Sequence, residues 1–311
     1  MTDITTIGEV LIDLTQTGAT PQNVPLLAAN PGGAPANVAV AAARLGAKTA
    51  FLGMVGRDGF GSYLTGVLAE NGVDVSGVHT DTAPTTMAVV TVSATGERSF
   101  RFVRGADCAL TPEEVDTRLV EQAKILHFGS VSLTAGLARS ATLFAAREAR
   151  AHGVLVSYDP NYRDALWSSQ EEAVEWMRIP LPLVDILKLS DEELPLLTGT
   201  EDPEEGSRRM EEKGVRLVLI TLGAGGAFYR WQGKTGLVPG VTTTVADTNG
   251  AGDTFLGAVL SRLTRRGDAP LDQLTAPELE TILAFANRAA AKTCSRSGAI
   301  PAMPTLAELE D

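Results

Sequence analysis

Short apolar runs alternate with longer amphipathic stretches along most of the 311-residue chain. The short runs predict buried strands, and the stretches with apolar residues at helical spacing predict helices between several of them. This alternation is typical of an α/β fold in which helices cover both faces of a mostly parallel sheet. The predicted strands are residues 4–7, 50–55, 124–128, 154–158, 186–189 and 217–221, and the predicted helices include residues 36–45, 137–150 and 204–213.

Residues 85–103 break this pattern, because their apolar residues alternate with a period of two. The sequence ATGE at residues 94–97 predicts a hairpin turn in the middle of this segment. We expect residues 11–14 to pair with the hairpin, so that a small β lid forms from about residues 10–30 and 85–105. The chain has no repeat, low-complexity tract or linker, and we therefore predict a single domain over residues 1–311.

The composition excludes several classes of protein. A formal net charge of −12 argues against a general nucleic-acid binder, although a local anion site built from backbone N–H groups needs no positive charge. Two cysteines, Cys108 and Cys294, are too few for a disulfide framework or a four-cysteine zinc site. No signal peptide is recognisable, and no apolar stretch is long enough to cross a bilayer. We therefore expect a cytoplasmic protein whose partners are small molecules rather than nucleic acids or membranes.

The segment that most strongly indicates chemistry is residues 245–263, VADTNGAGDTFLGAVLSRL. Apolar residues from Phe255 onward recur at helical spacing, so we expect a helix that begins near Gly252. The unpaired N–H groups of the first turn favour a phosphate there. Asp253 lies in this turn, where a carboxylate can accept a proton from an alcohol that attacks phosphorus. Taken alone, Asp253 fits equally well as an acidic residue that complements the helix dipole.

Two further glycine-rich segments are candidates for ligand binding. In residues 30–37, NPGGAPAN, the glycines let a ligand approach the main chain, and Asn37 offers a donor and an acceptor to hydroxyls. In residues 221–226, TLGAGG, glycines follow a predicted strand, where nucleotide phosphates often lie in open α/β sheets. A Walker A loop is excluded, because Phe228 occupies the position of the first glycine required before Lys234.

Together these motifs resemble the two signatures of the PfkB, or ribokinase-like, carbohydrate kinases. Residues 32–37, GGAPAN, match the start of the first signature, which continues through Gly46 to residues 56–58, and residues 247–253, DTNGAGD, match the second. Within the family the chain is most similar to fructokinases. The stretches that carry this similarity are residues 104–107 (RGAD), 127–130 (HFGS), 159–163 (DPNYR), 166–167 (LW), 188–194 (KLSDEEL) and 197–199 (LTG).

The resemblance implies a ribokinase-like three-layer α/β fold with a small β lid, and ATP-dependent phosphorylation of a sugar hydroxyl, with fructose converted to fructose 6-phosphate. It implies Mg²⁺ and often K⁺ as cofactors. Asp253 matches the catalytic base, and the backbone amides of Gly250, Ala251 and Gly252 match the anion hole. The positions that match substrate ligands are Asp13, Gly32, Gly33, Asn37, Arg104 and Arg163.

The same resemblance assigns nucleotide contacts and ion ligands in the second half of the chain. Glu193 matches the acidic end of an Asn-x-x-Glu motif that orders Mg²⁺ through water, whereas Ser190 stands where the motif has asparagine and lacks the reach of an amide. The nucleotide positions are Lys188, Ser190, Glu193, Thr221, Gly223, Gly225, Gly226 and Asn287. The monovalent-cation positions, which family members use mostly through main-chain carbonyls, are Asp247, Asn249, Thr293, Arg296, Gly298 and Ala302.

Two alternative functions stay open at this point. A 2-keto-3-deoxygluconate kinase would use Arg104 and Arg163 as a carboxylate clamp, although Phe102 stands where we would expect a tyrosine hydroxyl near that clamp. A catalytically silent sugar-binding regulator is the other alternative, and the intact Asp253 argues against it. We also infer a homodimer that forms through the lid, from the apolar residues Met87, Val89, Phe100 and Phe102.

Overall fold

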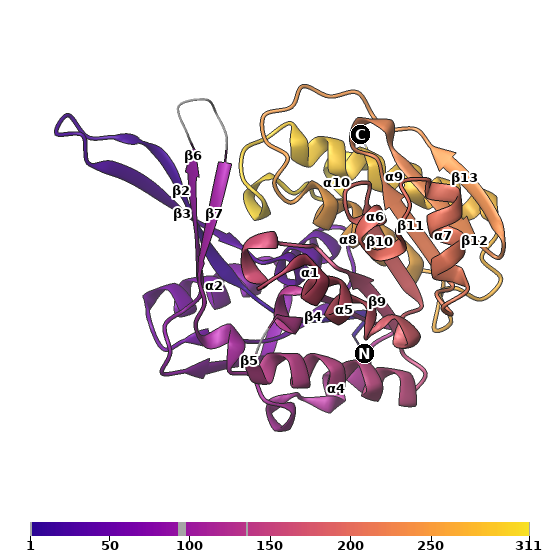
Figure 1. The fold of residues 1–311 in the computed structure, drawn as a ribbon, viewed down its shortest axis with the longest axis horizontal. Coiled ribbons are helices and arrows are strands. Elements are labelled where there is room, and N and C mark those ends of the chain that lie inside the picture. The colour runs from indigo at the N-terminus through magenta and orange to yellow at the C-terminus, as the bar shows by residue number, and fades with distance from the viewer. Residues whose placement is uncertain (1, 93–97, 135, 311) are drawn as a thin grey trace.

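The computed structural model describes residues 2–92, 98–134 and 136–310, and for residues 90–92 and 98–100 the backbone alone. The described residues form a nine-stranded sheet in the order β13-β12-β11-β10-β9-β8-β1-β4-β5 and a four-stranded sheet in the order β3-β2-β6-β7 (Figure 1). The strands of the large sheet are β1 (Ile4–Ile7), β4 (Thr49–Gly56), β5 (Val73–Asp81), β8 (Ile125–Gly129), β9 (Leu155–Asp159), β10 (Ile186–Ser190), β11 (Leu217–Thr221), β12 (Ala227–Trp231) and β13 (Lys234–Val238).

The large sheet is parallel from β5 to β11, and only β12 and β13 are added antiparallel at one edge. This confirms the mostly parallel sheet expected from the strand–helix alternation. From β1 the chain first adds β4 and β5 on one side and later adds β8 on the other. The order therefore reverses at β1, and in open α/β sheets ligands bind outside the carboxyl ends of the strands at such a point.

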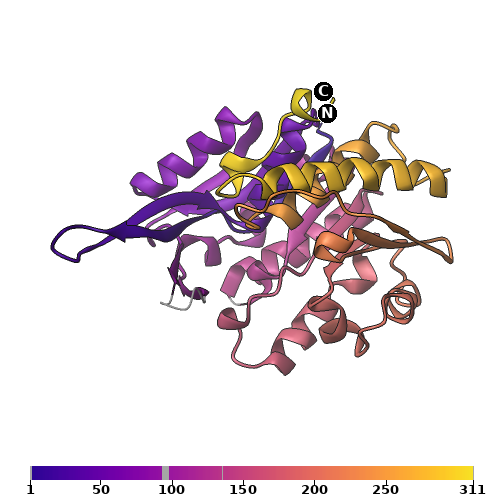
Figure 2. The same ribbon diagram turned by 90° about the horizontal axis from the view of Figure 1, so that it is seen from above.

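Helices cover both faces of the large sheet, so the body has three layers (Figure 2). Each strand contributes side chains to the hydrophobic cores on both faces of the sheet, because alternate side chains point to opposite faces. Leu126 and Phe128 pack with α4, whereas Ile125 packs with α8 and α9. One face carries α1 (Ala34–Arg44), α2 (Gly59–Glu70), α8 (Ala251–Thr264), α9 (Ala276–Cys294) and the short α10 (Ala307–Glu310), and the other carries α3 (Thr117–Glu121), α4 (Gly136–Ala151), α5 (Gln170–Arg178), α6 (Glu193–Thr198) and α7 (Pro203–Glu211).

The four-stranded sheet is a lid that projects from the body in both views (Figures 1 and 2). Its strands are β2 (Leu11–Ala19), β3 (Pro25–Gly32), β6 (Met87–Val92) and β7 (Arg98–Val103). β6 pairs antiparallel with β7, and Ile12 to Thr15 of β2 pair with β6, as the sequence predicts. The expected turn at residues 94–97 lies outside the described residues.

Partly buried hydrogen bonds tie one connection of the lid to the body and the two connections to each other. The N–H and hydroxyl of Thr85 each donate to the carboxylate of Asp58 over 2.8 Å, and the N–H of Gly105 donates to the Thr86 hydroxyl over 2.7 Å. Both chain connections to the β6–β7 hairpin are therefore held where they leave the body. None of the described helices is both long and apolar enough to cross a membrane.

Candidate active site

A cavity of about 530 Å³ lies where the lid meets the carboxyl ends of the central strands. Its walls come from β2 and β7 of the lid, the start of α1, the ends of β9 and β10, and the turn that leads into α8. The structure brings many of the predicted site residues to this one cavity. They are Asp13, Gly33, Asn37, Arg163, Lys188, Ser190, Glu193, Asn249, Gly250, Gly252 and Asp253.

Asp253 lies in the first turn of α8, with only 7% of its surface exposed. Its Oδ2 accepts a hydrogen bond from Nδ2 of Asn37 over 2.8 Å, and its Oδ1 accepts one from Nδ2 of Asn161 over 3.1 Å. Burial raises the pKa of Asp253 above its ordinary value, while the amide of Asn37 and the charge of Lys188 oppose this rise. The result is a desolvated carboxylate with a fixed orientation, which is what a general base requires.

The turn before Asp253 offers an anion site. The helix begins at Ala251, and Gly250 before it has a φ of 74°, a left-handed conformation that glycine adopts without strain. In the described part of the chain, the N–H groups of Gly252 and Asp253 have no hydrogen-bond acceptor. The ammonium of Lys188 lies against this turn, because a Cβ added to Gly252 would be 3.3 Å from it. Two free donors and a cation thus face the same space.

Asp13 is the polar group that the lid strand β2 contributes to the cavity. Gly32 lies on the neighbouring strand β3, where it pairs with Leu11, and a Cβ there would lie 2.3 Å from Oδ2 of Asp13. Gly32 thus provides room for the carboxylate without lining the cavity itself. Burial raises the pKa of Asp13 to about 6, with Asp253 adding to the rise and Arg163 opposing it. The two carboxyl groups of Asp13 and Asp253 therefore face one small, poorly solvated space.

The two predicted substrate arginines have different environments. Arg163 lines the cavity, and one of its guanidinium nitrogens donates to the carbonyl of Tyr162 over 3.0 Å. Arg104 is not among the lining residues, because its guanidinium pairs with Asp107 at 2.6 Å and donates to the hydroxyl of Thr134 over 2.8 Å. The structure therefore does not bring both arginines to the cavity.

Glu193 and Ser190 are joined by reciprocal hydrogen bonds at the start of α6. Oε2 of Glu193 accepts from the N–H of Ser190 over 2.8 Å, and the Ser190 hydroxyl accepts from the N–H of Glu193 over 3.2 Å. Oε1 of Glu193 accepts from the N–H of Tyr162 over 2.7 Å. Burial alone would raise the pKa of Glu193, but Lys188 and these N–H donors bring it below its ordinary value. Ser190 and Glu193 thus bond each other in the reciprocal pattern of a capping box, although Glu192 is the N-cap residue of α6.

The predicted nucleotide residues beyond β10 lie next to the cavity rather than in its wall. Thr221 ends β11 in register with Ser190, and Gly223, Gly225 and Gly226 follow it. Asn287 of α9 donates to the carbonyls of Val238 and Pro239 over 3.1 and 3.0 Å. The glycine turn packs against the same segment, because a Cβ at Gly226 would lie 2.1 Å from the Val238 carbonyl oxygen.

Three of the predicted cation positions, Asp247, Asn249 and Gly298, are joined by hydrogen bonds. The carboxylate of Asp247 accepts from the N–H groups of Asn249 and Gly298, each over 3.1 Å. Thr293 donates to the hydroxyl of Thr254 over 3.0 Å, and Arg296 pairs with Glu308 through its side chain. Ala302 lies in the short helical turn that follows, residues 300–302.

Besides Glu192 and Thr248, which also line the cavity, three polar residues of this region were not predicted as site residues. Glu9 and Asn161 line the cavity, and buried Asp159 pairs with Lys188 at 3.0 Å. Burial raises the pKa of Glu9 to about 7. Each of the three lies at or just after the end of a strand, β1 or β9, and that position is the signal that could have identified them.

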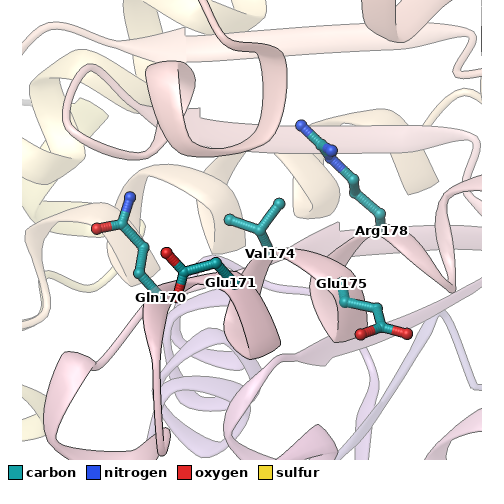
Figure 3. A pocket seen from close by; sticks show the side chains of 5 residues that line it. All are labelled: Gln170, Glu171, Val174, Glu175 and Arg178. Atoms are coloured by element: carbon teal, nitrogen blue, oxygen red, sulfur yellow. The ribbon is translucent and has the colours of Figure 1, made fainter.

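A second hollow of about 450 Å³ lies over α5 (Figure 3). Its five lining side chains, Gln170, Glu171, Val174, Glu175 and Arg178, all come from that single helix. Arg178 donates to the carbonyl of Leu197 over 2.7 Å, so its guanidinium serves to attach α5 to α6. The hollow therefore lacks the convergence of several elements that the cavity under the lid shows.

Comparisons with known proteins agree with this geometry. The chain matches the description "pfkB family carbohydrate kinase" over residues 1–306. Fructokinase-1 of Oryza sativa subsp. japonica is 42% identical over 312 residues, which cover 98% of this chain and 96% of that protein. Probable fructokinase-4 of Arabidopsis thaliana is 40% identical, with 99% and 95% covered.

Solved structures give the same result. Fructokinase of Xylella fastidiosa with bound ATP superposes with a TM-score of 0.92 at 35% identity, over 99% of this chain and 97% of that one. A fructokinase double mutant of Vibrio cholerae with fructose, ADP and potassium bound gives a TM-score of 0.89 at 32% identity, over 100% and 97%. The three-layer body and its β lid are thus ribokinase-like, and the chain belongs to the pfkB family of carbohydrate kinases.

Proposed function

We propose that this chain is an ATP-dependent fructokinase that transfers the γ-phosphoryl group of ATP to the 6-hydroxyl of fructose. Membership of the family makes it a phosphotransferase that acts on a sugar hydroxyl. The observation that carries the proposal is the position of Asp253, which faces Asp13 across the cavity and lies in the first turn of the helix that offers free N–H groups. The fructokinases among its relatives support fructose as the sugar.

We infer a role for each group during transfer from the geometry. Asp13 accepts hydrogen bonds from sugar hydroxyls and so orients the ring, since a carboxylate has several acceptor positions. Asp253 removes the proton of the attacking hydroxyl as its oxygen bonds to the γ-phosphorus. The N–H groups of Gly252 and Asp253, with the ammonium of Lys188, stabilise the charge on the transferred group. Because these groups are fixed before the substrates bind, little reorganisation accompanies the reaction.

Mg²⁺ fits the residues at the nucleotide side of the cavity. A solved relative, a putative ribokinase II of E. coli, is described in complex with ATP and Mg²⁺. Glu193 is held ionised, and each of its oxygens accepts one backbone N–H hydrogen bond, which leaves lone pairs for a hydrated hard cation. Glu193 would hold Mg²⁺ through water, and the bound ion would neutralise phosphate charge.

K⁺ fits the turn before α8, and the Vibrio cholerae relative is described with a bound potassium ion. The Asp247 carboxylate joins this turn to Gly298, so that two main-chain segments lie side by side there. Main-chain carbonyls suit a weakly hydrated cation. The guanidinium of Arg296 pairs with Glu308, so Arg296 would contribute its carbonyl and not its side chain. The set that would hold K⁺ is Asp247, Asn249, Thr293, Arg296, Gly298 and Ala302.

The two alternatives are less well supported. A 2-keto-3-deoxygluconate kinase needs a carboxylate clamp, and Arg104 is already paired with Asp107. A silent regulator would have no need of the base and the free N–H groups, and the relatives are named as enzymes.

A panel of sugars tests the proposal. Purified protein is given ATP, Mg²⁺ and fructose, glucose, ribose or 2-keto-3-deoxygluconate, ADP release is followed, and phosphorus NMR identifies the product. We expect fructose to give the highest kcat/KM and fructose 6-phosphate as its product. Preference for another sugar would overturn the proposed substrate, and sugar binding without turnover would support the regulator.

We further propose that residues 1–311 act as one domain, and that the protein works in the cytoplasm, where ATP is available. We also propose that its lid pairs with the lid of a second copy. Val24, Leu26 and Leu27 of the lid are 56%, 49% and 47% exposed. Met87, Val89 and Phe102 are only half-buried, and the side chain of Phe100 lies outside the described residues. Light scattering on wild type and Leu26→Asp tests this: a dimer that the variant disrupts supports it, and a monomeric wild type contradicts it.

A further inference from the structure

Asn161 contacts the proposed base directly, from the turn that follows β9. Its Nδ2 donates to Oδ1 of Asp253 over 3.1 Å, while Nδ2 of Asn37 donates to Oδ2 over 2.8 Å. An ionised carboxylate can only accept, so both amides must present their NH₂ groups to it. Each oxygen of Asp253 is thus held by one amide, and each still has lone pairs for a substrate hydroxyl.

The turn that carries Asn161 is fixed by its surroundings. The N–H of Asn161 donates to Oδ1 of Asp159 over 3.1 Å, and the N–H of Tyr162 donates to Glu193 over 2.7 Å. The carbonyl of Pro160 accepts from the N–H of Ser130 over 3.0 Å. Asn161 itself has a φ of 47°, and asparagine is one of the few residues with a side chain that enter this left-handed region readily. The position of its amide is therefore set by the backbone.

Several charged groups face Asp253 besides the two amides. Lys188 of β10 and Arg163 after β9 are the cations, and Asp13 of β2 and Asp159 of β9 are the acids. Burial is the largest influence and raises the pKa of Asp253, whereas the hydrogen bonds from Asn37 and Asn161 lower it. The amide of Asn161 therefore acts in the same direction as the cations.

We propose that Asn161 is a positioning residue whose amide, together with that of Asn37, holds the Asp253 carboxylate in the orientation and the ionised state that proton removal requires. This inference rests on the proposed kinase function. In the step it serves, the O–H bond of the sugar breaks, its proton passes to Asp253, the oxygen bonds to the γ-phosphorus, and the bond from that phosphorus to ADP breaks. The amide stays neutral throughout and acts only through Asp253.

Asn161→Gly is the most direct variant, because glycine tolerates the left-handed backbone and removes only the amide. A hydrogen bond to a charged group corresponds to about a 10- to 100-fold effect, so we expect kcat/KM for fructose near neutral pH to fall by about that factor. The acidic limb of the plot of kcat/KM against pH should move upward by about one pH unit. A residue with a merely structural role would not move this limb.

Asn161→Asp is the second variant, since it keeps the size of the side chain and the turn. It sets a second carboxylate against Asp253, and like charges raise the pKa of such a pair. The acidic limb should therefore move upward by more than in Asn161→Gly.

Gln273→Gly is the matched control, because Gln273 also has a left-handed φ, 55°, but does not line the cavity. The plot of kcat/KM against pH for Gln273→Gly should equal that of wild type.

Carbon-13 NMR of aspartate-labelled protein, with Asp253→Asn used for assignment, reads the pKa of Asp253 without any turnover. We expect this pKa to be higher in Asn161→Gly than in wild type by about one unit. An unchanged acidic limb together with an unchanged NMR pKa would overturn the inference. A wild-type protein that phosphorylates no sugar would instead overturn the proposed function, and the NMR titration would still decide the role of Asn161.

Discussion

The side-chain amide of Asn37 donates a hydrogen bond over 2.8 Å to Oδ2 of Asp253, although 216 positions separate the two residues in the chain. Asn37 belongs to α1 and Asp253 to the first turn of α8. These helices lie close together because Gly257 of α8 has no side chain: a Cβ there would be 2.7 Å from the Cβ of Ala41. The geometry of the proposed base is thus set by helix packing in the core.

Gly257→Ala should therefore destabilise the fold. Alanine gains about 1 kcal/mol of helix propensity over glycine, but overpacking costs about 1–3 kcal/mol, and we expect a net loss in the free energy of unfolding. Displacement of α1 from α8 should also lower kcat, because it lengthens the contact between Asn37 and Asp253. Denaturant unfolding and steady-state kinetics measure the two effects.

Gly66→Ala is the control for this prediction. Gly66 lies inside α2, and an added Cβ would meet nothing within 4 Å. It should raise the free energy of unfolding by about 0.5–1 kcal/mol through helix propensity alone. If both variants were stabilised equally, the close contact of α1 with α8 would be disproved.

The raised pKa of Glu9 should make the free energy of unfolding depend on pH. Burial raises its pKa from 4.5 to about 7 in the folded protein, so the folded state binds the proton more tightly than the unfolded state. The resulting stabilisation is complete below the unfolded pKa of 4.5 and is lost as the pH rises through about 7. Glu9→Gln keeps an acceptor for the N–H of Ala34, which Glu9 binds over 2.9 Å, and removes the titration.

We expect the difference in unfolding free energy between wild type and Glu9→Gln to fall by up to about 3 kcal/mol from about pH 4 to pH 8. Urea unfolding at several pH values measures this difference, and the titrations common to both proteins cancel in it. Parallel curves for the two proteins would show that Glu9 does not titrate in this range.

The parts of the fold that the sequence predicts are those in which burial leaves a pattern. β8 and β11 are covered on both faces, so they appear as short apolar runs. β5 at one edge and β13 at the other have mixed burial, and neither was predicted. An edge strand has a face or a side in water, and its residues therefore do not form a continuous apolar run.

The same distinction holds in the candidate site. The start of α8 and the position of Asp253 could be predicted, because the glycines and the helical repeat are local signals. The contact of Asn161 with Asp253 joins residues 92 positions apart, and the contact of Arg104 with the Thr134 hydroxyl joins residues 30 positions apart. Such contacts are set by the assembled fold and leave no mark in a local pattern.

Substrate choice should follow from Arg163, the one arginine among the described residues that line the cavity. Arg104 is paired with Asp107, so of the two predicted arginines only Arg163 would meet a substrate carboxylate. The two arginines therefore do not form a clamp around that carboxylate. We expect wild-type kcat/KM for fructose to exceed that for 2-keto-3-deoxygluconate by at least about tenfold, the lower limit of one charged hydrogen bond. A side-by-side assay of the two sugars decides this, and the reverse order would contradict the assignment of fructose.

Arg163→Lys extends this prediction. With a neutral sugar, lysine keeps the positive charge near Asp13 and loses only the geometry of the planar group, so kcat/KM for fructose should fall modestly, by less than about tenfold. With an acidic substrate the loss would be larger, since lysine cannot form a two-pronged bond to a carboxylate. A loss for fructose of more than about a hundredfold would show that Arg163 has a more direct role in transfer.

The most direct test of the account is the kcat of Asp253→Asn with ATP, Mg²⁺ and fructose. Asparagine has nearly the same size as aspartate but cannot take a proton, and loss of a general base costs about 10²–10⁴ in rate. We predict a fall in kcat within that range, with fructose affinity by calorimetry and the melting temperature changed far less. A folded Asp253→Asn protein whose kcat stays near that of wild type would contradict the assignment of Asp253 as the base.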